Sequence, residues 1–294
     1  MPQTAALPAA QAGTFTLGGD LTVNRMGFGA MRVTGKGIWG PPADHAAALA
    51  TLRRAVELGV NFIDTADSYG PGVSEEMIAE ALYPYPAGLV IATKAGWTRH
   101  GPGVWQHNAS PSHIAEAAEG SLKRLRVDRI DVFQLHVPDP AVNFDASVEA
   151  LARLREQGKI RHAALSNVTL EHLERARRIV PIVSVQNRYS FSDREWDAMV
   201  DRCEALGMAF LPWGPMAQGR QASEAIRKIA TARKVSTAVV SLAWLLRRSP
   251  AIVPIPGTSQ VKHLEENVSA AGFKLSDAEF AALNAVAPKP YWLR

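Results

Sequence analysis

Four side chains that could move or stabilise a proton follow three consecutive apolar runs of the sequence. Asp64 and Tyr69 lie in one segment, Lys94 closes the second run, and His136 closes the third. Short continuous apolar runs are typical of buried parallel strands, so each side chain is expected near the carboxyl end of a strand. Catalytic groups of a parallel α/β barrel gather at that end. A phenol, an ammonium, a carboxylate and an imidazole gathered there predict a proton-donating site.

Length and composition favour one eight-stranded α/β barrel. The chain has 294 residues, of which 47% are apolar and 20% charged. This length is usual for one such barrel, and the composition argues against disorder. We therefore expect a single domain over residues 1–294. Residues 1–13 have no basic region ahead of an apolar block, so they predict a flexible or loosely docked tail and no secretory signal.

Composition also bears on location and partners. Cys203 is the only cysteine, so no intrachain disulfide can form and a reducing cytoplasm is the simplest setting. The apolar stretches are too short to span a bilayer, so no membrane is expected. The net charge is only +4, and the densest basic cluster, Arg175, Arg177 and Arg178, ends an amphipathic helix. A solvated helix end is expected there, with no nucleic acid as partner. The sequence does not predict an oligomeric state.

No metal site is expected. None of the eight histidines forms a metal-ligand pair at helical spacing, and His100 and His107 share a loop without further ligands.

Strand and helix patterns alternate along the whole chain. The predicted strands are residues 25–29, 62–64, 89–93, 131–135, 160–165, 182–185, 209–212 and 252–255. The predicted helices are residues 45–58, 75–82, 111–125, 145–156, 170–179, 193–206, 223–247 with a break, and 276–286. Asp44 and Ser110 are expected as N-caps. Eight alternations without a change of composition predict a (β/α)8 TIM barrel.

A doubly wound sheet is the competing fold. It would need a G-x-G-x-x-G turn after its first strand. Gly27 and Gly29 begin such a pattern, but Arg32 stands at the third glycine and no helix start follows. Residues 14–17 and 21–23 flank a Gly-Gly-Asp turn, which predicts an N-terminal β-hairpin that caps the closed bottom of the barrel.

Six short segments occur together in the order of one enzyme family. They are Asp64-Thr65-Ala66-Asp67-Ser68-Tyr69-Gly70, Thr93-Lys94, Leu135-His136, Leu165-Ser166-Asn167, Val185-Gln186-Asn187 and Ile255-Pro256-Gly257-Thr258. The chain resembles the aldo-keto reductase family over nearly its whole length. The resemblance implies a (β/α)8 barrel, a reduced nicotinamide cofactor bound without a Rossmann domain, and reduction of a carbonyl compound to an alcohol.

The chemistry of the four residues agrees with this resemblance. Reducing a carbonyl needs a hydride on carbon, which the cofactor supplies, and a proton on oxygen. A free tyrosine is a poor acid near neutral pH, but a nearby ammonium lowers its pKa. The resemblance therefore implies Tyr69 as the acid and Lys94 as that ammonium. Asp64 would keep Lys94 charged, and His136 would orient the carbonyl oxygen.

The resemblance also assigns residues to the cofactor. The residues expected at the nicotinamide are Ser166, Asn167 and Gln186 on its carboxamide, Trp213 stacked on the ring, and Gly214, Pro215 and Met216 beside it. The residues expected at the adenosine end are Gly257, Thr258, Ser259, His263, Glu266 and Asn267. Backbone N–H groups ahead of a helix suit phosphate, so NADPH is expected as cofactor, with NADH possible.

The substrate is predicted from aromatic residues in the loops after the first and third strands. Met31, Trp39, Trp97 and Trp105 are expected to wall the pocket, which favours aromatic or heteroaromatic carbonyl compounds. The segments at residues 37–42 and 82–85 resemble a bacterial branch of the family that includes pyridoxal reductases. Two alternatives stay open: a Schiff-base lyase acting through Lys94, and a nucleotide-binding regulatory subunit with little turnover.

Overall fold

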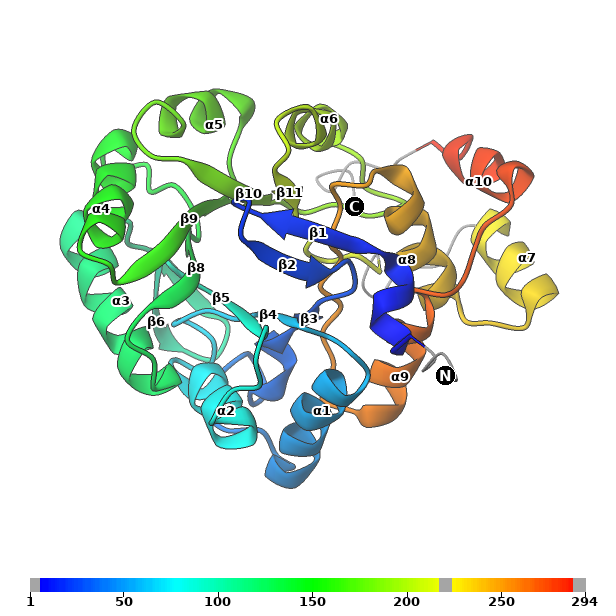
Figure 1. Ribbon diagram of the computed structural model, residues 1–294, viewed down its shortest axis with the longest axis horizontal. Coiled ribbons are helices and arrows are strands. Elements are labelled where there is room, and N and C mark those ends of the chain that lie inside the picture. The colour runs from blue at the N-terminus through cyan, green and yellow to red at the C-terminus, as the bar shows by residue number, and fades with distance from the viewer. Residues whose placement is uncertain (1–5, 217–223, 288–294) are drawn as a thin grey trace, which may run out of the picture.

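The chain folds into a (β/α)8 barrel (Figure 1). The computed structural model describes residues 6–216 and 224–287. Seven parallel strands form one curled sheet in chain order: β3 (Phe28–Gly29), β4 (Phe62–Asp64), β5 (Val90–Ala95), β8 (Ile130–Leu135), β9 (Ile160–Ser166), β10 (Ile182–Gln186) and β11 (Ala209–Phe210). Each strand pairs with the one before it, as the alternating sequence pattern predicts.

The eighth predicted strand closes the barrel without forming a regular strand. Ile252 makes an isolated parallel bridge to Phe210 on one side. On the other side, the N–H groups of Gly27 and Gly29 donate to the carbonyls of Pro254 and Pro256. Proline has no N–H to give to a ladder, so Pro254 and Pro256 only accept hydrogen bonds there.

Helices surround the sheet (Figure 1). They are α1 (His45–Glu57), α2 (Val73–Leu82), α3 (Pro111–Leu125), α4 (Phe144–Glu156), α5 (Leu170–Ala176), α6 (Asp197–Ala205), α7 (Glu224–Arg233), α8 (Thr237–Arg248), α9 (Val261–Ser269) and α10 (Asp277–Asn284). The expected caps are confirmed: the side chains of Asp44 and Ser110 accept from the N–H groups of Ala47 and His113. The expected break within residues 223–247 is also confirmed and lies between α7 and α8; the start of that predicted helix, Ser223, lies outside the described residues.

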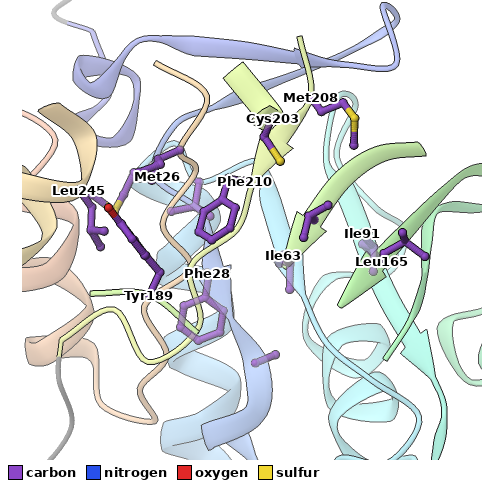
Figure 2. Close-up of a cluster of buried hydrophobic side chains, with 14 of the residues drawn as sticks. Met26, Phe28, Ile63, Ile91, Leu165, Tyr189, Cys203, Met208, Phe210 and Leu245 are labelled. Atoms are coloured by element: carbon purple, nitrogen blue, oxygen red, sulfur yellow. The ribbon is translucent and has the colours of Figure 1, made fainter. Parts of the chain in front are cut away.

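Alternation along the strands separates two apolar layers. Phe62 belongs to a cluster on the barrel axis, whereas Ile63 belongs to the larger cluster between sheet and helices. Val90 and Ile91 divide in the same way, because successive side chains of a strand point to opposite faces. Figure 2 shows part of the outer layer, in which Cys203 is fully buried.

A β-hairpin caps one end of the barrel, as predicted. Its strands are β1 (Thr14–Leu17) and β2 (Leu21–Asn24), which cross the barrel mouth in Figure 1. Leu17, Leu21 and Val23 are buried in the same cluster as the axial side chains of the barrel strands. The hairpin therefore completes the core at the end opposite the strand carboxyl ends.

The structure differs from the sequence predictions in the N-terminal segment and in the segment after β5. The sequence predicts a flexible or loosely docked tail over residues 1–13, whereas Pro8–Ala12 forms a 3₁₀ helix. In this helix Ala9 is fully buried and its N–H donates to the carbonyl of Leu58; residues 1–5 lie outside the described part. The loop expected after β5 is an antiparallel hairpin of β6 (Trp97–Gly101) and β7 (Val104–His107). A second 3₁₀ helix covers Ala30–Val33.

Within the described ranges, no single helix is long and apolar enough to cross a membrane; α7 and α8 meet that test only as a pair, which is bent by 104°.

Candidate active site

The four predicted residues gather because of side-chain alternation. Phe62 and Val90 point to the barrel axis. Asp64 lies two positions after Phe62, and Lys94 lies four positions after Val90, so both also point to the axis, near the strand carboxyl ends. In the structure the Nζ of Lys94 donates to Oδ2 of Asp64 over 2.6 Å.

Lys94 is a buried charge with a complete set of acceptors. Its side chain is fully buried, and its Nζ also reaches the carbonyl of Thr65 at 2.7 Å and the Oη of Tyr69 at 3.4 Å. Burial alone would lower the pKa of Lys94, but Asp64 and Tyr69 raise it above its ordinary value. Lys94 is therefore an ammonium near neutral pH. A protonated amine is a poor nucleophile, which argues against Schiff-base chemistry at this position.

Two glutamines hold Asp64 from the other side. The Nε2 atoms of Gln134 and Gln186 donate to Oδ1 of Asp64 at 2.9 and 2.8 Å. The sequence predicts that Gln186 binds the carboxamide of the cofactor, whereas in the structure its amide nitrogen donates to the carboxylate of Asp64. Gln134 was missed, although it lies two positions after the axial Val132. The same alternation that brings Asp64 inward could have identified it.

Tyr69 and His136 complete the group. Their rings are perpendicular with centroids 5.8 Å apart, and each side chain is 7% exposed. Burial raises the pKa of Tyr69, and Lys94 lowers it by less, so the expected net decrease is wrong for the protein alone. Burial and the charge of Lys94 hold the pKa of His136 well below its ordinary value. Near neutral pH the phenol is protonated and the imidazole is uncharged.

Residues predicted at the nicotinamide lie beside this group. Asn167 donates from Nδ2 to the carbonyl of His136 at 3.0 Å and to Oγ of Ser166 at 3.1 Å. Its Oδ1 accepts from Nε1 of Trp213 at 2.9 Å. Trp213 is 38% exposed, the guanidinium of Arg188 lies 5.5 Å from its ring centroid, and it begins the turn through Gly214.

The rest of that turn is packed less openly. Pro215 is buried, and Met216 is partly buried against the outer core. Trp213 is therefore the member of this segment that presents an aromatic surface.

The turn predicted to bind phosphate, residues 257–259, lies against β3, where the last segment of the barrel meets the first strand; we call this the phosphate turn. A Cβ on Gly257 would come within 2.5 Å of the carbonyl oxygen of Gly29, so only glycine fits there. The Cγ of Arg32 lies 3.7 Å from the place of that Cβ, so the stem of this side chain passes beside the turn.

Helix α9 follows this turn with an N-terminus open to an anion. Its N-cap, Gln260, makes no side-chain cap bond, and the Oγ1 of Thr258 accepts from the Gln260 N–H at 3.1 Å. Unpaired N–H groups at a helix start bind phosphate. Beyond the partly buried Ser259, the predicted His263 is exposed and Asn267 is buried, while Glu266 is half-buried. The tight glycine contact, the open helix end and the exposed Trp213 face fit a nicotinamide dinucleotide.

Aromatic rings approach the four residues from the β6–β7 hairpin. Trp105 meets Tyr69 edge to face with centroids 6.5 Å apart, and Trp97 meets His136 at 6.4 Å. Trp97 and Trp105 also contact each other, at 5.8 Å.

The other two predicted substrate residues come from the segment after β3. Trp39 bridges to Gly70, next to Tyr69. Met31 lies in the 3₁₀ helix at Ala30–Val33 and is half-buried. In the parts of the chain that the structure covers, no group of three or more His, Cys, Asp or Glu could hold a metal ion.

The chain is similar to known oxidoreductases over nearly its whole length. It is 48% identical over 283 residues to an uncharacterized oxidoreductase of Schizosaccharomyces pombe, covering 96% of this chain and 92% of that one. It is 41% identical over 280 residues to pyridoxine 4-dehydrogenase of Escherichia coli, covering 93% and 98%.

Solved structures agree with these relatives. A glycerol dehydrogenase from Gluconobacter oxydans matches with a TM-score of 0.82 at 25% identity, over 93% of this chain and 94% of that one. An aldo-keto reductase from Klebsiella pneumoniae in complex with NADPH matches with a TM-score of 0.80 at 27% identity, over 95% and 96%. The model of the aldo/keto reductase family matches residues 25–288, and the chain belongs to that family.

Proposed function

We propose that this enzyme uses NADPH to reduce aromatic and heteroaromatic aldehydes, pyridoxal among them, to alcohols. The observation that carries the proposal is the buried ammonium of Lys94, which donates to both Asp64 and Tyr69. A buried lysine paired to a carboxylate and aimed at a phenol is suited to stabilise a phenolate. We also propose that residues 1–294 act as one domain, in a reducing cytoplasm that suits a single buried cysteine.

The four residues divide the proton chemistry among them. A nicotinamide cofactor held beside Trp213 would supply the hydride for the carbonyl carbon. Tyr69 gives its Oη proton to the carbonyl oxygen, and Lys94 stabilises the phenolate that remains. Asp64 keeps Lys94 charged. The neutral imidazole of His136 donates a hydrogen bond to the same carbonyl oxygen and so orients it against Tyr69.

Trp97 and Trp105 support the choice of an aromatic substrate. Their rings lie against His136 and Tyr69, where a carbonyl would bind. A planar substrate ring gains both buried area and ring contacts from such walls. The similarity to pyridoxine 4-dehydrogenase supports a pyridine ring in particular.

A panel of carbonyl substrates tests this proposal. NADPH oxidation would be measured with pyridoxal, benzaldehydes, glyceraldehyde and free hexoses. The expected result is a higher kcat/KM for at least one aromatic aldehyde than for every aliphatic one. A higher kcat/KM for glyceraldehyde or a hexose than for all aromatic aldehydes would overturn the substrate class. Absence of turnover on every compound, with NADPH bound, would instead favour the regulatory subunit.

The preference for NADPH rests on the turn before α9. The 2′-phosphate that distinguishes NADPH from NADH would meet the open helix N-terminus, and the exposed His263 stands one turn further along. Dissociation constants of both cofactors, for the wild type and His263→Ala, test this assignment. We expect tighter NADPH binding in the wild type and a smaller preference in the variant. Tighter NADH binding by the wild type would contradict the preference.

A further inference from the structure

The side chain of Arg99 is buried in the β6–β7 hairpin with all of its hydrogen-bond donors in use. It is 8% exposed. A guanidinium has five N–H groups and no acceptor. The five acceptors are the backbone carbonyls of Val104, which binds Nε at 2.9 Å, Ile38 and Ser68, which bind Nη1 at 2.9 Å each, and Gly37 and Gly101, which bind Nη2 at 3.0 and 3.4 Å. Arg99 therefore has no N–H left for a substrate.

These five carbonyls belong to three separate segments around the site. Gly37 and Ile38 lie in the loop that carries Trp39. Ser68 directly precedes Tyr69. The remaining two carbonyls belong to the hairpin that carries Trp97 and Trp105. One side chain thus joins the segment of the predicted proton donor to both segments of the predicted pocket wall.

The guanidinium also stacks on the aromatic wall. Its central carbon lies 3.7 Å from the ring centroid of Trp105 and 5.8 Å from that of Trp39. Trp105 in turn meets the ring of Tyr69. A planar cation over an aromatic face is held by both charge and dispersion. The position of Trp105 relative to Tyr69 therefore depends on Arg99.

Backbone strain in the loop that carries Trp39 supports the dependence of the pocket wall on Arg99. Ile38 has a φ of +56°, a conformation that β-branched residues rarely adopt. Its carbonyl accepts from both Arg99 and the N–H of Gly70, at 3.3 Å. The loop also touches the hairpin directly, because the N–H of Gly103 donates to the carbonyl of Gly37 at 3.1 Å. Strained backbone persists only where its surroundings hold it, so loss of Arg99 should release this loop.

We propose that Arg99 is a positioning residue that sets the shape of the substrate pocket by tying the Trp39 loop and the tryptophan hairpin to the segment of Tyr69. It acts through those segments and touches neither substrate nor cofactor. The proposal rests on the proposed function, since the pocket is the one assigned to aromatic aldehydes. Lysine keeps the charge but has three donors and no planar fork, so it cannot replace the guanidinium.

The test compares Arg99→Lys and Arg99→Ala with Arg247→Lys as a matched control. Arg247 also stacks on an aromatic ring, Phe280 at 4.6 Å, and donates to a backbone carbonyl, that of Leu275. We expect both Arg99 variants to bind NADPH as the wild type does. Their KM for a benzaldehyde should rise at least about tenfold, with a smaller fall in kcat, because the wall moves and the four residues stay.

Two readouts separate positioning from general stability. The ratio of kcat/KM for benzaldehyde to kcat/KM for propanal should fall in both Arg99 variants but not in Arg247→Lys. Millimolar guanidinium should partly restore the KM of Arg99→Ala. A wild-type KM and preference in Arg99→Lys would overturn the proposal, as would equal kinetic losses in the control.

Amide hydrogen exchange tests the role of Arg99 even if no substrate is found. Amide exchange at Gly103 and Gly70 should accelerate in the Arg99 variants, because these N–H groups donate to the two carbonyls that Arg99 holds. Unchanged exchange at both would contradict the proposal. If the wild type reduces no carbonyl compound, the proposed function fails, and the exchange result still decides the role of Arg99.

Discussion

Lys94 is the residue on which the account of the site depends. A buried ammonium is costly unless it is paired and hydrogen-bonded, and here Asp64, the carbonyl of Thr65 and Tyr69 supply the partners. Its identity could be predicted from the motif order. The net effect of Lys94 on the pKa of Tyr69 could not be predicted. Burial raises that pKa, and the depth of burial is a property of the packed barrel.

Lys94→Met and Asp64→Asn should distinguish the effect of the Lys94 charge on catalysis from the effect of the Asp64 side chain that holds Lys94 in place. Lys94→Met removes the group that stabilises the phenolate, so kcat should fall at least about tenfold further than in Asp64→Asn. Asp64→Asn should be less stable than the wild type by about 1–3 kcal/mol, because an amide cannot accept from Lys94 and from both glutamines at once. Steady-state kinetics and denaturant unfolding measure the two effects. A larger kcat loss in a folded Asp64→Asn would show that the assigned roles are wrong.

Asp67 predicts a pH-dependent stability. Burial and the nearby Glu75 raise the pKa of Asp67 from 3.8 to about 8. The folded protein therefore holds this proton more tightly than the unfolded chain. The resulting stability is complete below the unfolded pKa and is lost as pH rises toward about 8, by at most about 1.4 kcal/mol per pH unit.

Asp67→Asn removes this titration. The melting temperature of the variant relative to wild type should rise steadily between about pH 5 and 8. The exposed Asp128→Asn serves as control and should show a constant difference. Parallel curves for Asp67→Asn and wild type would contradict the raised pKa.

At the scale of elements, the strands and helices were more predictable than the loops between them. Each strand core follows from an apolar run, and Asp44 and Ser110 mark their helix starts correctly. The β6–β7 hairpin was missed, although Gly101, Pro102 and Gly103 are a turn signal between two alternating segments. The bonds of Arg99 to Gly37, Ile38 and Ser68 could not be foreseen, because they join segments far apart in the sequence.

The seam between β3 and the phosphate turn yields a prediction at this scale. Gly257→Ala should force the two backbones apart, since its Cβ would meet the carbonyl of Gly29 at 2.5 Å. We expect a Kd for NADPH raised at least about tenfold, since the turn itself must shift, and a lower Tm. The control is Gly120→Ala in α3, where the nearest atoms belong to the end of the flexible Arg124 side chain. Normal NADPH binding by Gly257→Ala would remove the turn from the cofactor site.

At the scale of the whole molecule, the barrel and its hairpin cap were predicted, and the closure was not. Eight alternations imply eight strand positions, but at the last one the prolines at residues 254 and 256 have no N–H to donate, and no regular strand forms. The 3₁₀ helix at Pro8–Ala12 was also missed, because five residues are too few to show a periodicity.

The hairpin cap should contribute stability and not chemistry. Leu17 is 1% exposed within the axial cluster, at the end of the barrel away from the four residues. Leu17→Ala should lower the free energy of unfolding by about 2–5 kcal/mol and leave kcat within about twofold. Thr16→Ala, on the exposed face, should change stability by no more than about 0.5 kcal/mol. A large loss of kcat with unchanged stability would contradict this division.

Tyr69→Phe tests the central claim most directly, because it keeps the ring and deletes only the proposed proton donor. NADPH binding would be measured by fluorescence and aldehyde reduction by NADPH oxidation, with the exposed Tyr83→Phe as control. We predict an NADPH Kd equal to that of the wild type and a fall in kcat of about 10²–10⁴-fold or more, while the control keeps wild-type kcat. Near-normal reduction by Tyr69→Phe would contradict the account.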